Sequence, residues 1–264
     1  MRSFRRTATS VVALALALCA LASTARAQQT IINVPSVDQT PRGRWFFLHE
    51  SQVRAWDINR DAGRREFWAT THFLTYGVTD RFELAATAYN LGTPFKPNAA
   101  IGLGWKTAFG IPGLARRAPR WEPKLGLGQM VPISLRSDAF RDSAGLGRRV
   151  GLWSYAQAAV RLPGPQTRLM VGVSNGSRNL FKKNTTHAIA SWEQPLGILP
   201  GRLGDALEHI NFLGEWWSGS HDFADFVPGL NYHHHDLVVI VGYKIPNAKQ
   251  GVGHGLIFEI GTTF

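Results

Sequence analysis

The chain has 264 residues, of which 44% are hydrophobic and only 18% charged, with 27 glycines and 14 prolines. This composition excludes an intrinsically disordered chain, which needs low hydrophobicity and high charge, and a long coiled coil, which needs many Glu, Lys and Arg residues. The formal net charge of +11 would suit a nucleic-acid-binding protein. The basic residues are spread along the chain, however, and we expect no nucleic-acid partner.

The N-terminus is typical of a secretory signal peptide. Basic residues at positions 2, 5 and 6 precede the apolar run Val11–Ala22, and Ala25–Ala27 supplies the small residues of a cleavage site. The run is shorter than the roughly 20 residues of a membrane-spanning helix. Residues 1–27 are therefore predicted to be removed on export, and residues 28–43 to form an N-terminal periplasmic segment. Cleavage would also remove Cys19, which is the only cysteine, and leave no possible disulfide.

The rest of the chain alternates with the period of two that indicates β-strands. In the last strand, Glu259 and Gly261 lie on one face, and the other face is apolar. The apolar face consists of Leu256, Phe258, Ile260, Thr262 and Phe264. A soluble sandwich would turn such a face into its core, whereas a membrane barrel turns it to lipid. The terminal aromatic residue favours the barrel. The signal recognised by the outer-membrane insertion machinery is predicted to be Phe258, Ile260, Thr262 and Phe264.

The same alternation predicts twelve strands, each about the length of a tilted membrane strand. Their expected ranges are 44–56, 65–76, 82–91, 99–109, 122–135, 148–162, 167–175, 185–195, 210–218, 224–233, 237–245 and 254–264. The predicted fold of residues 44–264 is therefore a twelve-stranded antiparallel up-and-down transmembrane β-barrel. The connections 110–121 and 196–209 are longer than the short periplasmic turns such barrels have.

Two parts of the chain resemble a known family. Tyr76–Ala88 and Phe226–Phe264 are similar to the outer-membrane transporter family named after meta-pathway phenol degradation. The matching residues are Tyr76, Gly77, Asp80, Arg81, Glu83, Leu84, Pro228, Gly229 and Tyr232. The resemblance implies a barrel of consecutive strands in the outer membrane of a Gram-negative bacterium, and a transport role. It supplies no catalytic residues, and we infer no phenol substrate from it.

Charged residues on the inner faces of the predicted strands are the candidate site. They are Glu50, Arg54, Glu83, Lys106, Lys124, Arg149, Arg161, Arg168, Glu215, Lys244 and Glu259. They would either line a pore that selects solutes by charge or pair with one another and fill a narrow lumen. By topology Arg54 and Lys244 are the cations nearest to Glu259, so we expect Glu259 to form an ion pair with at least one inward Arg or Lys.

Metal and catalytic sites are not expected. The run His233–His235, followed by Asp236, could bind a metal, but strand alternation puts at most two of its imidazoles on one face, and a polar periplasmic turn is the preferred interpretation. Ser174 and His187 could approach each other near an outer loop, as a lipid hydrolase would need, but no third catalytic residue stands out. We expect no cofactor.

The sequence therefore predicts a passive channel or transporter for small solutes rather than an enzyme. The alternatives are a plugged structural barrel without conductance and, less favoured, a lipid-modifying enzyme. The expected partners are outer-membrane lipids, lipopolysaccharide, the barrel-assembly machinery and an unidentified small solute. Basic residues in the predicted outer loops suit lipopolysaccharide phosphates. They are Arg136, Arg141, Arg178, Lys182 and Lys183.

Overall fold

The computed structural model describes residues 34–54, 68–90, 99–135, 149–181, 184–221, 223–247 and 253–264. The predicted signal peptide, residues 1–27, lies outside the described residues, as do most of the predicted outer loops. No helix in the described part of the chain is long and apolar enough to cross a membrane.

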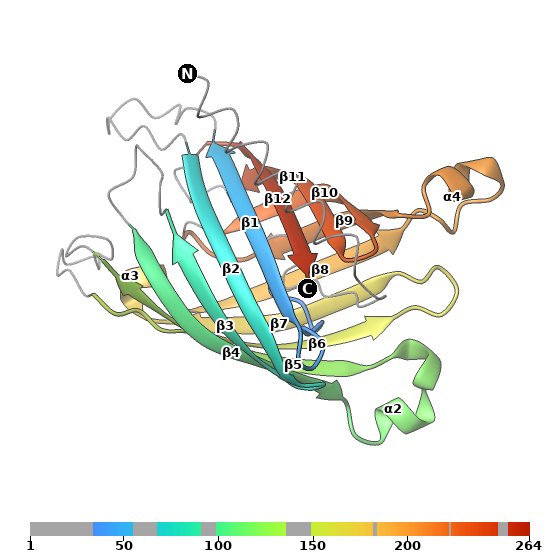
Figure 1. The fold of residues 1–264 in the computed structure, drawn as a ribbon, viewed down its shortest axis with the longest axis horizontal. Helices are drawn as coiled ribbons and strands as arrows, with labels where there is room; N and C mark the ends of the chain where they lie inside the picture. Colours follow the sequence, from blue (N-terminus) through green and yellow to red (C-terminus); the bar gives the residue numbers. More distant parts are fainter. Residues whose placement is uncertain are drawn as a thin grey trace.

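Twelve antiparallel strands close into a single barrel (Figure 1). Each strand pairs with its neighbours along the chain, and the first strand pairs with the last. This confirms the predicted fold, and every strand overlaps its predicted range. The strands are β1 (Trp45–Arg54), β2 (Trp68–Thr79), β3 (Phe82–Tyr89), β4 (Ala100–Gly110), β5 (Lys124–Ser134), β6 (Trp153–Arg161), β7 (Arg168–Gly176), β8 (Thr186–Pro195), β9 (Ile210–Trp217), β10 (Asp225–His234), β11 (Leu237–Pro246) and β12 (Gly255–Thr263).

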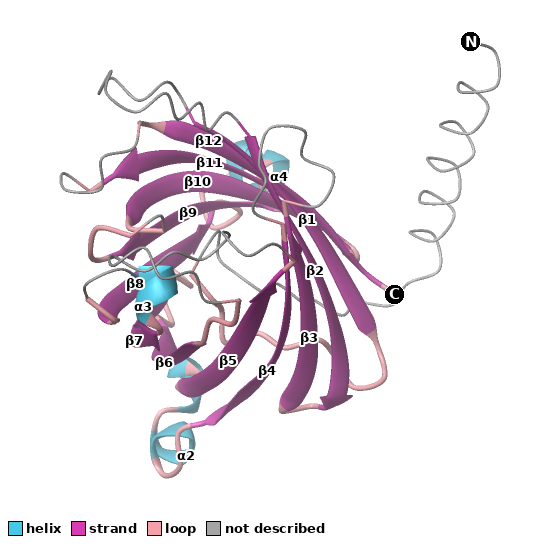
Figure 2. Cartoon of the chain, turned by 90° about the vertical axis from the view of Figure 1, so that its left-hand side faces the viewer, coloured by secondary structure: helices cyan, strands magenta, loops and turns pink. Residues whose placement is uncertain are grey.

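The two ends of the barrel differ. One end, called the turn end, carries the connections 80–81, 162–167 and 235–236 together with Phe264; the opposite end is called the loop end. The two long connections at the turn end contain the short helices α2 (Leu114–Arg117), η1 (Pro119–Trp121) and α4 (Arg202–Ala206). Figure 1 shows α2 and α4 extending away from the barrel wall, while α3 (Arg178–Phe181) lies at the loop end, which faces the viewer in Figure 2.

Exposure alternates along the strands as the sequence predicts. On β7, the side chain of Val171 is 62% exposed on the outer face, whereas its neighbour Met170 is 1% exposed on the inner face. Leu103 on β4 and Leu256 on β12 are similarly exposed to the outside. Because every strand is paired on both sides, the backbone polar groups of the wall are satisfied within the barrel, as a lipid environment requires.

The barrel closes where β1 meets the chain terminus. The backbone N–H of Trp45 donates to the carbonyl of Phe264, and the N–H of Phe264 donates to the carbonyl of Trp45, both at 2.9 Å. The side chains of Phe258, Ile260 and Phe264 are exposed on the outer face of the last strand. The terminal residue thus belongs to the seam as well as to the apolar exterior.

Deleting Phe264 is expected to reduce the folded fraction of the barrel. The deletion removes both backbone hydrogen bonds to Trp45, and in the cell it would also remove the last residue of the predicted insertion signal. The measurement is the heat-modifiable folded band on gels, with Phe264→Tyr as the control that keeps an aromatic terminus. Equal folded yield of the deletion and the native chain would contradict this role.

Candidate functional site

The N-terminal segment before β1 runs through the inside of the barrel. We call residues 34–43 the inner segment. At its start, the N–H of Val34 donates to Glu215 Oε2 on β9 at 2.8 Å. Near its end, the N–H of Thr40 donates to Glu83 Oε2 on β3 at 2.7 Å. Strands β3 and β9 lie six places apart in the twelve-stranded ring, so the inner segment reaches from one wall to the opposite wall.

Further contacts hold the middle of the inner segment. Gln157 Nε2 on β6 donates to the carbonyl of Pro35 at 2.5 Å, and Gln39 Nε2 donates to the carbonyl of Lys106 on β4 at 3.2 Å. The side chain of Val37 is 2% exposed and belongs to the hydrophobic core inside the barrel. The sequence places residues 28–43 on the periplasmic side and does not foresee these contacts.

Gly77 allows the end of the inner segment to lie against the wall. Arg42 forms a parallel bridge with Gly77 on β2, and the N–H of Gly43 donates to the carbonyl of Gly77 at 2.7 Å. A Cβ atom at Gly77 would lie 2.2 Å from the carbonyl oxygen of Pro41, a distance that no side chain can adopt. Glycine at this position therefore fixes where the inner segment leaves the lumen and enters β1.

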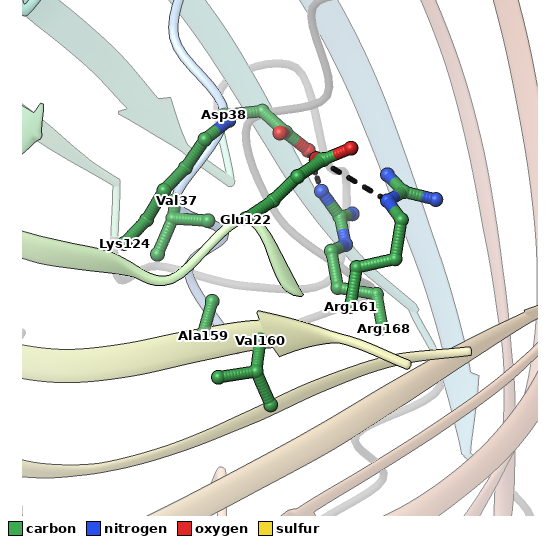
Figure 3. Close-up of a pocket in the computed structure, with 8 residues that line it drawn as sticks. All are labelled: Val37, Asp38, Glu122, Lys124, Ala159, Val160, Arg161 and Arg168. Carbon is green, nitrogen blue, oxygen red and sulfur yellow. Dashed lines mark hydrogen bonds and ion pairs between the residues drawn. The ribbon is translucent and has the colours of Figure 1, made fainter. Parts of the chain in front are cut away.

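An ion-pair network lies beside a small pocket at the turn end of the barrel (Figure 3). Arg168 on β7 binds Asp38 of the inner segment, and its other guanidinium nitrogen lies 2.6 Å from Glu193 on β8. Burial alone would raise the pKa of the Asp38 carboxyl, but attraction to the Arg168 guanidinium outweighs this and holds the pKa below its usual value. Beside this network, Arg161 and Glu122 lie 3.3 Å apart across a small pocket.

Aromatic side chains form a cluster at the loop end. Phe181 of α3 and Trp217 of β9 form a buried cluster with Val34. Their rings contact the imidazoles of His187 and His221, whose centroids lie 4.2 Å apart. The inner segment, the ion pairs at the turn end and the aromatic cluster at the loop end therefore all lie inside the barrel.

Most of the predicted inward charges lie inside the barrel. The buried ones are Glu50, Glu83, Lys106, Arg168, Glu215, Lys244 and Glu259. Lys124 and Arg161 are half-buried at the turn end. Arg149 is exposed and precedes β6, so the structure does not place it in the lumen, and the side chain of Arg54 lies outside the described residues.

The pairing of the predicted inward charges differs in part from the expectation. Glu83 and Lys106 form a buried ion pair at 3.2 Å. Lys244, expected beside Glu259, contacts Asp225 at 3.0 Å and Gln52 Oε1 at 2.8 Å, and it also attracts the Glu259 carboxyl electrostatically. Asp225, Asp38 and Glu193 are absent from the predicted set. Of these, Glu193 could have been predicted from the sequence, because the alternation along β8 places its side chain on the inner face.

The two weaker candidate sites have ordinary structural roles. Ser174 and His187 are register partners on β7 and β8, but Ser174 Oγ accepts a hydrogen bond from Trp217 Nε1 at 3.1 Å, and His187 Nε2 contacts the carbonyl of Asn184 at 2.8 Å. His233 and His234 end β10, and His235 adopts a φ of 52° in the turn to β11. Among the described residues no group of three or more potential ligands could hold a metal ion.

No family model matches the chain, and no curated protein matches it. The resemblance to the phenol-degradation transporter family therefore stays a prediction. Among solved structures, the chain is similar to the KdgM porin in complex with disordered oligogalacturonate, with 8% identity, 84% of this chain and 98% of that chain covered, and a TM-score of 0.49. It is also similar to an outer membrane channel from Pseudomonas putida F1, with 14% identity and a TM-score of 0.45. The match covers 86% of this chain and 97% of that chain. A third similar structure is LpxR from Salmonella typhimurium, with 11% identity and a TM-score of 0.45. The match covers 83% of this chain and 100% of that chain.

Proposed function

We propose that the protein is an outer-membrane channel for small solutes that its own inner segment closes in the conformation described here. The observation that carries this proposal is the position of the inner segment, which is bound to β9 at one side and to β3 at the other. A segment in this position blocks the route along the barrel axis, and its displacement would open that route.

The exterior of the barrel supports a location in the outer membrane of a Gram-negative bacterium. Large apolar side chains such as Leu103, Val171 and Leu256 are exposed around the wall, which in water would leave an extended apolar surface. Lipids would cover this surface. The exposed Arg178 at the loop end would meet lipopolysaccharide phosphates, and the last strand would be read by the barrel-assembly machinery.

The contacts that hold the inner segment inside the barrel are of a kind that can break, so the segment could leave the lumen and open the channel. The segment is held by hydrogen bonds, by the ion pair between Asp38 and Arg168, and by the packing of Val34 and Val37. A neutral hydrogen bond contributes about 0.5–1.5 kcal/mol to stability, and a hydrogen bond to a charged group, such as those to Glu215 and Glu83, about 1.5–3 kcal/mol. Because all these contacts are non-covalent, the segment can leave the lumen, and the open state would be the minor population.

Conductance in planar bilayers tests the proposal. Residues 34–40 are replaced by a Gly/Ser sequence of equal length with proline at positions 34 and 40. This removes the side chains of the inner segment and also the two backbone N–H groups that bind Glu215 and Glu83, but keeps the connection to β1. We expect steady conductance well above that of the native chain. The matched control is a Gly/Ser replacement of Leu114–Arg117, which lies in a connection outside the lumen and should leave conductance at the native level.

The rival function is a plugged structural barrel without conductance. If the 34–40 variant gives the folded, heat-modifiable band but conducts no ions, the channel proposal fails and the structural barrel is favoured. If the control variant conducts as much as the 34–40 variant, the opening does not depend on the inner segment.

A further inference from the structure

Three inward cations meet at the turn end of the barrel. Lys124 on β5, Arg161 on β6 and Arg168 on β7 all line the small pocket there (Figure 3). Arg161 and Arg168 are register partners. Lys124 is the register partner of Ala159, a buried residue two positions before Arg161 on the same face of β6. Like charges on neighbouring strands destabilise a sheet, so this corner of the lumen requires anions.

The wall itself supplies two anions to this corner. Glu122, just before β5, lies 3.3 Å from the Arg161 guanidinium, and its side chain is 51% exposed. Glu193 on β8 lies 2.6 Å from Arg168 and accepts a hydrogen bond from Asn211 Nδ2 at 2.7 Å, which fixes its position. Among the described wall residues that line the pocket or contact Arg168, three cations therefore face two carboxylates, which leaves one positive charge.

Asp38 compensates the remaining positive charge, and it belongs to the inner segment rather than to the wall. Its carboxylate binds the Arg168 guanidinium and is also attracted by Lys124 and Lys106. Its own N–H donates to Ser36 Oγ at 3.1 Å, a contact within the segment. The third anion of this corner is therefore attached to the part of the chain that closes the lumen in the proposed function.

Arg168 can bind a carboxylate more completely than it binds Asp38. The Arg168 side chain is only 7% exposed, and its Nε has no hydrogen-bond acceptor among the described residues. A guanidinium offers a planar fork of N–H donors that matches a carboxylate in a bidentate contact. A buried donor without an acceptor is costly, and a free carboxylate, which no backbone holds in place, could accept from it. The Arg161 side chain is 29% exposed, so the corner can be reached from the turn end.

We propose that Lys124, Arg161 and Arg168 bind the carboxylate group of the solute that the channel conducts, and that Asp38 takes the place of this group while the channel is closed. The solutes of this class are small organic acids in their anionic form. This inference rests on the proposed function, because the cations lose Asp38 when the inner segment moves. The solute carboxylate and Asp38 compete for the same cations, so binding of the solute favours the open conformation.

The stability of an Asp38→Ala barrel tests the carboxylate site. The variant keeps the inner segment but removes its carboxylate, so we expect a lower thermal unfolding midpoint of the purified full barrel in detergent. Sodium acetate up to about 100 mM, a range suited to so small a ligand, is expected to raise this midpoint back toward that of the native chain. Acetamide has the same shape without the charge and should have no effect, and sodium chloride at equal concentration controls for ionic strength.

The matched control variant is Asp205→Ala in the α4 connection, which extends away from the barrel wall. It should neither lose stability nor respond to acetate. If Asp38→Ala does not fold, Asp38→Ser takes its place. Equal rescue by sodium chloride, an equal acetate response in the Asp38 and Asp205 variants, or an Asp38→Ala barrel as stable as the native chain would overturn the proposed site.

Channel recordings test the competition and separate this inference from the proposed function. In planar bilayers, acetate in place of chloride is expected to increase the fraction of time for which the native channel is open, and Lys124→Gln is expected to reduce this increase. If the 34–40 variant conducts and acetate does not change the open fraction of the native chain, the competition is wrong but the channel proposal stands. If the 34–40 variant conducts no ions, the channel proposal fails, whereas rescue of Asp38→Ala by acetate still supports the carboxylate site.

Discussion

Replacing Lys244 by Met is expected to lower the free energy of unfolding by about 3–5 kcal/mol, the usual cost of breaking a buried ion pair from one side. The Lys244 side chain is completely buried and contacts Asp225 at 3.0 Å and Gln52 Oε1 at 2.8 Å. Methionine fills a similar volume but leaves the buried Asp225 carboxylate without its ammonium partner. Urea unfolding of the barrel in lipid vesicles, followed by tryptophan fluorescence, measures the change.

Two further variants separate charge from packing. Lys244→Met combined with Asp225→Leu removes both charges, and we expect it to recover a large part of the loss, because apolar pairs often replace buried ion pairs without penalty. Lys124→Met at the half-buried turn end is the control and should change the free energy by no more than about 1 kcal/mol. A Lys244→Met barrel as stable as the native chain would contradict the importance of this ion pair.

Replacing Val171 by Arg is expected to lower the free energy of unfolding by about 2–4 kcal/mol, the cost of a lipid-facing Arg near the bilayer midplane. Val171 lies in the middle of β7 and is 62% exposed on the outer face. The same vesicle experiment measures this change, with Val171→Leu as the control that keeps an apolar side chain. If the Arg variant folds as well as the native chain, Val171 does not face lipid and the outer surface has another environment.

The architecture was predictable because it depends on a pattern repeated along the chain. In β12 the alternation of Leu256, Phe258 and Ile260 with Ile257 and Glu259 fixes which side chains point outward. A slip of one residue in any strand would turn its apolar face into the lumen. Because this constraint acts on every strand, the strand number and the inside-outside phase both follow from the sequence.

The inner segment was not predictable in the same way. Residues 34–43 show no strand alternation, and their partners lie far away along the chain: Thr40 and Glu83 are 43 residues apart, and Val34 and Glu215 are 181 residues apart. In both contacts the donor is a backbone N–H, which every residue except proline carries. The identities of Val34 and Thr40 therefore say nothing about these contacts.

The pairing of inward charges depends on stagger and side-chain length, which a strand pattern does not specify. Alternation alone places Lys244 and Glu259 on the inner wall, and topology makes their strands neighbours. The lysine also contacts Asp225 on β10, which the predicted set does not include, and Glu259 lies opposite Glu50 on β1. The position of Glu259 opposite a second carboxylate follows only from the register between β1 and β12.

A reversible tether between the inner segment and the wall tests the closure of the channel. A Cβ atom at Gly126 would lie 3.7 Å from Val37 Cα and 3.1 Å from Val37 Cγ1, which is within reach of a disulfide. In a Val37→Cys, Gly126→Cys chain, we predict that the oxidised barrel is silent in planar bilayers and that reduction restores the openings seen with each single cysteine variant. Equal conductance before and after reduction, with the disulfide confirmed by mass spectrometry, would contradict a closing role for the inner segment.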